Sequence, residues 1–106
     1  MIETRIFVGL NDSETLSQKY STEKYTNILK SVCRAYKVPF SFSAIEGGYM
    51  HENGEYTQEK TLVISLIDVP KETVSEIAKD LCVFFHQESV LITEDRVRAY
   101  FINGKI

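Results

Sequence analysis

Tryptophan is absent from this chain of 106 residues, and proline and glycine are scarce, with two and five residues. The composition therefore excludes a collagen-like chain and gives no sign of a disordered or low-complexity segment. The longest apolar runs are only a few residues, far short of the roughly 20 that a membrane-spanning helix needs. What remains is an ordinary globular composition, 43% hydrophobic and 25% charged, in which six Phe and six Tyr supply bulky core residues.

Cysteine is scarce as well, and both cysteines fall on the apolar stripes of predicted helices. We expect Cys33 and Cys82 to be small buried hydrophobes. No CxxC or HxxxH spacing occurs, so the sequence predicts neither a metal site nor a cofactor.

An excess of positive charge is also missing. The formal net charge is −3, and the 12 Lys and Arg residues are spread along the chain. Nucleic-acid binding depends on Lys and Arg that displace counterions from phosphates, so we do not expect nucleic acid as a partner. The first residues, MIETRIFVGL, lack the basic segment, long apolar segment and cleavage site of a secretory signal. We therefore expect a cytoplasmic protein of a bacterium or phage, with no membrane partner.

The apolar pattern predicts two helices between the strands of one sheet. Residues 3–10 alternate as a strand, and residues 11–20 form a polar loop. From Thr22 to Tyr36 the apolar residues follow the spacing of a helix with one buried face, and Ser21 or Thr22 supplies its N-cap oxygen. Pro39 ends this helix, because the residue before a proline is pushed out of the α region.

The second half of the chain repeats this arrangement. Residues 40–49 alternate, Asn53-Gly54 predicts a hairpin turn, and residues 56–67 form a long apolar strand typical of a sheet centre. A second helix follows Pro70; then come a strand over residues 89–93, a turn at Glu94-Asp95 and an extra strand over residues 97–102. The order predicts one α+β domain over residues 1–106. Its fold would be ferredoxin-like, βαββαβ, with an antiparallel sheet and two helices on one face.

Two helices cannot cover both faces of such a sheet. The uncovered face is expected to carry four apolar or aromatic residues: Phe7, Tyr56, Val63 and Ile67. We interpret them as an interface, either with a second copy of the chain in a homodimer or with another protein.

Polar residues near the hairpin form the candidate ligand site: Tyr49, His51, Glu59 and Gln87. A two-residue turn at Asn53-Gly54 would place Gly48 opposite Glu59 and Tyr49 close by, so that a carboxylate and a phenol could act as an acid and base pair. The other interpretation is a hairpin stem exposed to water. Glu59 is of interest in both, because a strand interior disfavours Glu.

Three strings carry a family resemblance: Phe7-Val8-Gly9-Leu10, Gly47-Gly48-Tyr49 and Gln87-Glu88-Ser89-Val90. With them the chain, from Arg5 to about Ile102, resembles a bacterial family of uncharacterised function, the DUF3574 domain family. Tyr49 stands where members of that family often have Trp. The resemblance implies the same order of strands and helices and brings no activity with it.

The sequence leaves three functions open. The favoured one is a small cytosolic interaction module without catalysis, acting through the uncovered sheet face in an oligomer or as a phage- or plasmid-encoded inhibitor of a host protein. The second is a small enzyme or small-molecule-binding protein with a pocket near Tyr49, Glu59 and Gln87. The third, RNA binding on the sheet, is disfavoured because the aromatic strings that it needs are missing.

Overall fold

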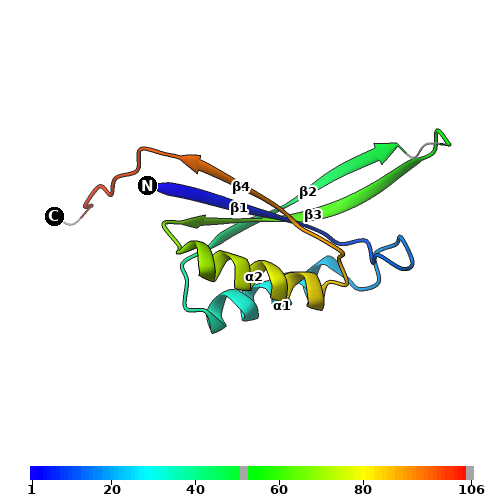
Figure 1. The fold of residues 1–106 in the computed structure, drawn as a ribbon, viewed down its shortest axis with the longest axis horizontal. Helices are drawn as coiled ribbons and strands as arrows, with labels where there is room; N and C mark the ends of the chain where they lie inside the picture. The colour runs from blue at the N-terminus through cyan, green and yellow to red at the C-terminus, as the bar shows by residue number, and fades with distance from the viewer. Residues whose placement is uncertain (51–52, 105–106) are drawn as a thin grey trace.

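The computed structural model describes residues 1–50 and 53–104. Its elements follow one another as β1 (Ile2–Gly9), α1 (Thr22–Ala35), β2 (Ser41–Met50), β3 (Tyr56–Ile67), α2 (Lys71–Phe84) and β4 (Leu91–Arg96). The strands form an antiparallel sheet in the order β2-β3-β1-β4, and both helices pack on the same face of it (Figure 1). The predicted ferredoxin-like βαββαβ fold is confirmed.

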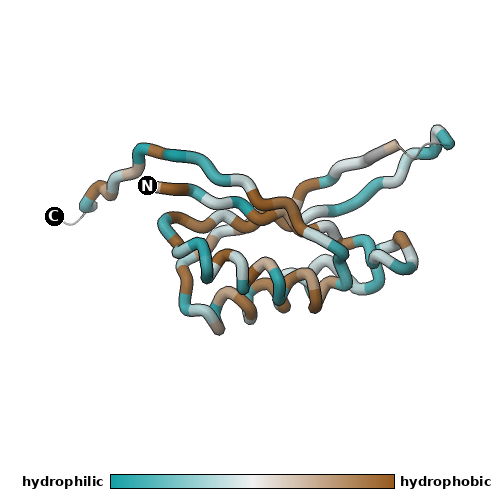
Figure 2. The backbone as a smooth tube through the Cα atoms, in the orientation of Figure 1, coloured by the Kyte–Doolittle hydropathy of each residue, from teal (hydrophilic) through white to brown (hydrophobic). Residues whose placement is uncertain are grey.

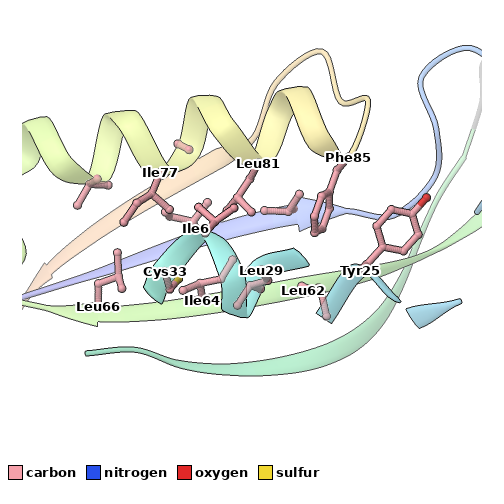
Figure 3. Packing of buried hydrophobic residues seen from close by; sticks show 14 of the residues in the cluster. Ile6, Tyr25, Leu29, Cys33, Leu62, Ile64, Leu66, Ile77, Leu81 and Phe85 are labelled. Carbon is pink, nitrogen blue, oxygen red and sulfur yellow. The ribbon is translucent and has the colours of Figure 1, made fainter. Parts of the chain in front are cut away.

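The hydrophobic core fills the space between this face and the helices (Figure 3). β3 points Leu62, Ile64 and Leu66 toward the helices, and all three are fully buried. The helices bury the predicted stripes: Tyr25, Leu29, Val32 and Cys33 from α1, and Val74, Ile77, Ala78 and Leu81 from α2. Cys33 is buried as predicted, whereas Cys82 is only partly buried, and both are free thiols.

The ends of both helices follow from local sequence. At the start of α1, the Ser21 hydroxyl accepts a hydrogen bond from the Lys24 N–H at 3.1 Å, which is the predicted N-cap. Pro70 stands just before α2, where its missing N–H costs no helical hydrogen bond. No helix among the described residues is long and apolar enough to cross a membrane.

The β2–β3 hairpin extends past the helices as a two-stranded ribbon (Figure 1), and its register differs from the prediction. Met50 pairs with Tyr56, so the connection spans residues 51–55 instead of two residues. As a result Gly47, and not Gly48, lies opposite Glu59, while Tyr49 lies opposite Thr57. Gly54 does adopt a positive φ of 85°, the conformation for which glycine was expected there.

The end of the chain also departs from the prediction. β4 continues through the predicted turn at Glu94-Asp95, because these two residues pair with Thr4 and Glu3 of β1. The extra strand predicted over residues 97–102 is absent: residues 97–104 form no strand. After Val97, whose N–H donates to the Met1 carbonyl at 2.9 Å, this segment runs outward past the N-terminus (Figure 1).

Strand alternation identifies the residues of the uncovered face. Phe7 pairs directly with Val63, and both are half-buried on the side away from the helices; Ile67 is in phase with Val63 and exposed. All three therefore lie on the uncovered face, and their role as an interface stays a prediction. The prediction for Tyr56 was wrong, because it is in phase with Leu62 and therefore lies on the helix side, at a point beyond the helices where it is 72% exposed.

Candidate functional site

Glu59 lies on the uncovered face of β3, between glycines of the two neighbouring strands. Gly47 of β2 is directly opposite it. On the other side, a Cβ built on Gly9 of β1 would lie only 2.5 Å from Glu59 Oε2, so the carboxylate occupies the space that a side chain would need. A Cβ on Gly47 would meet no atom within 4 Å. The carboxyl group therefore folds over Gly9 and leaves open space above Gly47.

The carboxylate of Glu59 completes the end of the β1–β3 ladder. The Leu10 N–H donates to the Lys60 carbonyl at 2.9 Å, as in a regular ladder. At the next residue the Asn11 N–H donates instead to Glu59 Oε2 at 3.0 Å. The Asn11 side-chain amide donates to the Gln58 carbonyl at 3.2 Å. This structural role, and not the exposed hairpin stem considered from sequence, accounts for a Glu in β3.

Gln87 reaches Asn11 from the opposite direction. After α2 the chain turns at His86, which has a positive φ of 51°, and the Gln87 N–H donates to the Cys82 carbonyl at 2.9 Å. This left-handed residue after a helix, with a hydrogen bond back to its last turn, is a common helix ending. It directs Gln87 toward β1, where Nε2 donates to the Asn11 carbonyl at 2.6 Å. Glu59 and Gln87, predicted to be neighbours, thus meet at Asn11.

Asp12, which sequence reasoning placed in a plain polar loop, is also part of this arrangement. Its side chain is buried, and Oδ1 accepts a hydrogen bond from the Glu14 N–H at 2.8 Å. That hydrogen bond, helped by the nearby His86, holds the pKa of Asp12 below its ordinary value. Oδ2 lies 3.4 Å from His86 Nδ1, and the Ser13 N–H donates to the His86 carbonyl at 3.1 Å. The loop after β1 is therefore fastened to the end of α2.

Two hollows meet at Asn11 and Glu59. The larger, of about 480 Å³, lies beside the hairpin and is lined by Asn11, Gln18, Glu46, Gly47, Gly48, Tyr56, Gln58, Glu59 and Lys60. The smaller, of about 340 Å³, is lined by Asn11, Asp12, Ser13, Leu16, Glu59, Gln87, Glu88 and Ser89. The larger hollow falls within the range of roughly 300–1,000 Å³ that small-molecule sites occupy.

The larger hollow has the chemistry of a site for an organic cation. Glu46 supplies a carboxylate and Tyr56 an exposed aromatic ring from the helix side of the hairpin, and Glu59 supplies a carboxylate from the opposite face. The described residues give Glu59 Oε1 no hydrogen bond, whereas Oε2 is held by Asn11, so one oxygen of a fixed carboxylate can receive a donor. No group of three or more His, Cys, Asp or Glu that could hold a metal occurs within residues 1–50 and 53–104.

Two of the predicted site residues cannot be placed in this arrangement. His51 lies outside the described residues, and of Tyr49 the structure describes the backbone, which pairs with Thr57. Their roles as ligand-binding residues stay predictions. The residues that sequence reasoning missed are Gly9, Asn11 and Asp12. Their only signal is their position, a glycine at the end of a strand followed closely by two residues with short polar side chains.

Among known proteins, the chain is similar to solved structures only. No family model and no curated protein matches the chain, and the resemblance to the DUF3574 family stays a prediction. A phage SAM lyase in complex with S-methyl-5'-thioadenosine is similar to it with a TM-score of 0.66 and 28% identity, covering 89% of this chain and 79% of that one. The apo state of a phage SAM lyase gives a TM-score of 0.68 and 27% identity, covering 89% and 78%.

A more distant likeness supports the fold. The periplasmic divalent cation tolerance protein CutA from Archaeoglobus fulgidus matches with a TM-score of 0.57, covering 93% of this chain and 87% of that one. At 13% identity this likeness concerns the fold alone.

Proposed function

We propose that this chain binds S-adenosylmethionine in the hollow beside the hairpin and cleaves it to S-methyl-5'-thioadenosine. The observation that carries the proposal is the likeness, at 28% identity over 89% of the chain, to a phage SAM lyase bound to that thioadenosine. Among the functions left open by the sequence, this is the small enzyme with a pocket near Glu59 and Gln87.

The hollow offers a chemical partner for each part of S-adenosylmethionine. The ligand carries a sulfonium and an ammonium cation, which suit the carboxylates of Glu46 and Glu59, and a carboxylate, which suits the ammonium of Lys60. The ring of Tyr56 can stack on adenine. The amide of Gln58 can hydrogen-bond the ribose or the edge of the base.

The charge change in the reaction suggests where Glu59 acts. Release of S-methyl-5'-thioadenosine breaks the bond between sulfur and the aminobutyryl chain, and the bonding electrons stay on sulfur, which loses its positive charge. The carboxylate oxygen of the ligand itself forms the new bond to the carbon that leaves sulfur, so the aminobutyryl chain departs as a five-membered lactone. A carboxylate held against the sulfonium would stabilise the reactant more than the transition state and would slow the step. The proposal therefore places Glu59 at the ammonium group of the aminobutyryl chain, where its charge partner persists throughout the reaction and orients the ligand.

The test is to incubate the protein with S-adenosylmethionine and to separate the products by chromatography. S-methyl-5'-thioadenosine should accumulate in proportion to protein, and Glu59→Gln should lower the rate by about 100-fold. Glu55→Gln, the same change in the connection of the same hairpin, is the matched control and should keep the rate. The proposal is wrong if S-adenosylmethionine yields no S-methyl-5'-thioadenosine and neither compound raises the melting temperature of the wild type.

The uncovered sheet face favours a second function. A hollow of about 500 Å³ opens on it, with Phe7, Ile45 and Val63 among its lining residues. This proposal is that the face binds a protein partner: a second copy in a homodimer, or a host protein if the chain is encoded by a phage or plasmid. For both functions we place the protein in the cytoplasm, where S-adenosylmethionine is available. Light scattering of wild type and Val63→Asp tests the homodimer.

A further inference from the structure

The sheet has two free edges, and only one of them is protected against pairing with another chain. β4 ends in Glu94, Asp95 and Arg96, and charged side chains on an edge discourage an added strand. β2, with ten residues, contains no proline and no lysine, and Glu46 is its only charge. A long edge of this composition is a ready template for one more strand.

The C-terminal tail, residues 97–104, has the character of such a strand. Tyr100, Phe101 and Ile102 are 80%, 92% and 82% exposed, and Figure 2 shows part of this tail in the brown of hydrophobic residues. Consecutive large apolar residues in water indicate a surface that another molecule covers. Arg98 is the only charged residue of this tail. An apolar, basic tail complements an edge whose one charge is acidic.

The tail cannot reach β2 of its own chain. It follows β4, and β4 and β2 are the opposite edges of the sheet, with β1 and β3 between them. The three strand spacings amount to roughly 14 Å, whereas Arg98 is only two residues beyond the end of β4 at Arg96 and can lie no more than about 7 Å from it. Figure 1 also shows the tail leaving the domain at the end opposite to the tip of the hairpin. A tail that pairs with β2 must therefore come from another molecule, and every copy offers both a tail and an edge.

We infer that residues 98–102 of the tail add a strand to β2 of a second copy of this chain. The antiparallel register that fits places Arg98 opposite Glu46 and Ile102 opposite Phe42. It joins opposite charges at one end and apolar side chains at the other, both of which stabilise cross-strand pairs. A parallel strand over the same residues would put Ile102 beside Glu46 and Arg98 beside Phe42. This contact goes beyond the proposed function and uses other residues than the uncovered face.

Light scattering after size exclusion, at high micromolar concentration, tests the inference on the full chain. The wild type should have at least twice the mass of the 12.2 kDa chain. A chain that ends at Val97, and so keeps all of β4, should be a monomer with an unchanged circular dichroism spectrum and cooperative melting. A monomeric wild type would overturn the inference. A truncated chain that still associates would also overturn the inference. If adding Val63→Asp to that truncated chain then makes it monomeric, the interface is the uncovered face.

A charge reversal tests the register. Arg98→Glu and Glu46→Lys should each weaken association by about tenfold, and the double variant should recover it, because the opposite charges face each other again. Arg34→Glu, which reverses an exposed charge near the end of α1, is the control and should leave association unchanged. If the loss of association in the double variant equals the sum of the losses in the two single variants, these two residues do not face each other and the proposed register is wrong.

Discussion

Replacing Gly9 with alanine would test how the carboxylate of Glu59 is held. The backbone of Gly9 is outside the left-handed region, so alanine fits its conformation. In a strand interior the exchange alone would stabilise the protein by about 0.5–1 kcal/mol. The new Cβ would, however, lie 2.5 to 2.7 Å from the three atoms of the Glu59 carboxyl group, so that group must move. When it moves, the Asn11 N–H loses its acceptor.

The magnitude follows from these two opposing effects. A hydrogen bond to a charged acceptor contributes about 1.5–3 kcal/mol, and the partial exposure of Glu59 favours the lower end of that range. After subtraction of the gain from alanine, Gly9→Ala should destabilise the protein by about 1 kcal/mol, which lowers the melting temperature by about 4–8 °C in a domain of this size. Gly47→Ala, on the opposite side of Glu59, meets no atom and should be neutral or stabilising.

Urea denaturation of a double-mutant cycle measures the contact directly. In a Glu59→Ala background the carboxyl group is gone, so Gly9→Ala should there be stabilising by about 0.5–1 kcal/mol. The change of sign between the two backgrounds is the expected result. If Gly9→Ala has the same effect in both, the carboxylate does not occupy the space above Gly9 and the geometry of the site is refuted.

Three further predictions concern the core and the titrating groups. Ile64→Asp should unfold the domain, because it buries an unpaired charge, whereas Val63→Asp should leave it folded. Circular dichroism of the two variants is the measurement. If Val63→Asp unfolds and Ile64→Asp stays folded, the two faces of the sheet have been assigned the wrong way round. The pKa of Asp12 is lowered by folding, so its contribution to stability is present above about pH 4 and is lost at lower pH; the stability difference between wild type and Asp12→Asn should shrink on acidification. The Tyr36 hydroxyl donates to Asp80 at 2.7 Å, which raises the pKa of Tyr36 to about 12 from 10.0. That contribution is complete below pH 10 and lost toward pH 12, so wild type should lose stability there more steeply than Tyr36→Phe in alkaline denaturation.

The fold was accessible from the sequence because its strongest signals are local. The helix over Thr22–Ala35 repeats its apolar residues with helical spacing, and its cap residue Ser21 stands directly before it. The strand over Tyr56–Ile67 alternates so regularly that the buried phase of Leu62, Ile64 and Leu66 was evident. Such patterns arise within one element and need no knowledge of its neighbours.

The errors share a different cause, since they depend on contacts between distant segments. Glu94-Asp95 has the composition of a turn, yet its backbone is held in β4 by pairing with β1, almost a whole chain length earlier. The hairpin register depends on how many residues the connection uses, and a signal at Asn53-Gly54 does not determine that number. Asn11 resembles an ordinary loop residue in the sequence because three of its partners, Gln58, Glu59 and Gln87, are far away along the chain.

The meeting of Glu59 and Gln87 at Asn11 gives the candidate site its rigidity. Glu59 belongs to the hairpin and Gln87 to the end of α2, and the hydrogen bonds of 3.0 and 2.6 Å tie both to the same residue of the chain. A ligand that reaches the remaining oxygen of Glu59 therefore meets a carboxylate that has already lost its rotational freedom. Less entropy is then lost on binding than with a freely rotating Glu. This explains how a structural role for Glu59 and a role in binding can coexist, because the first prepares the geometry that the second requires.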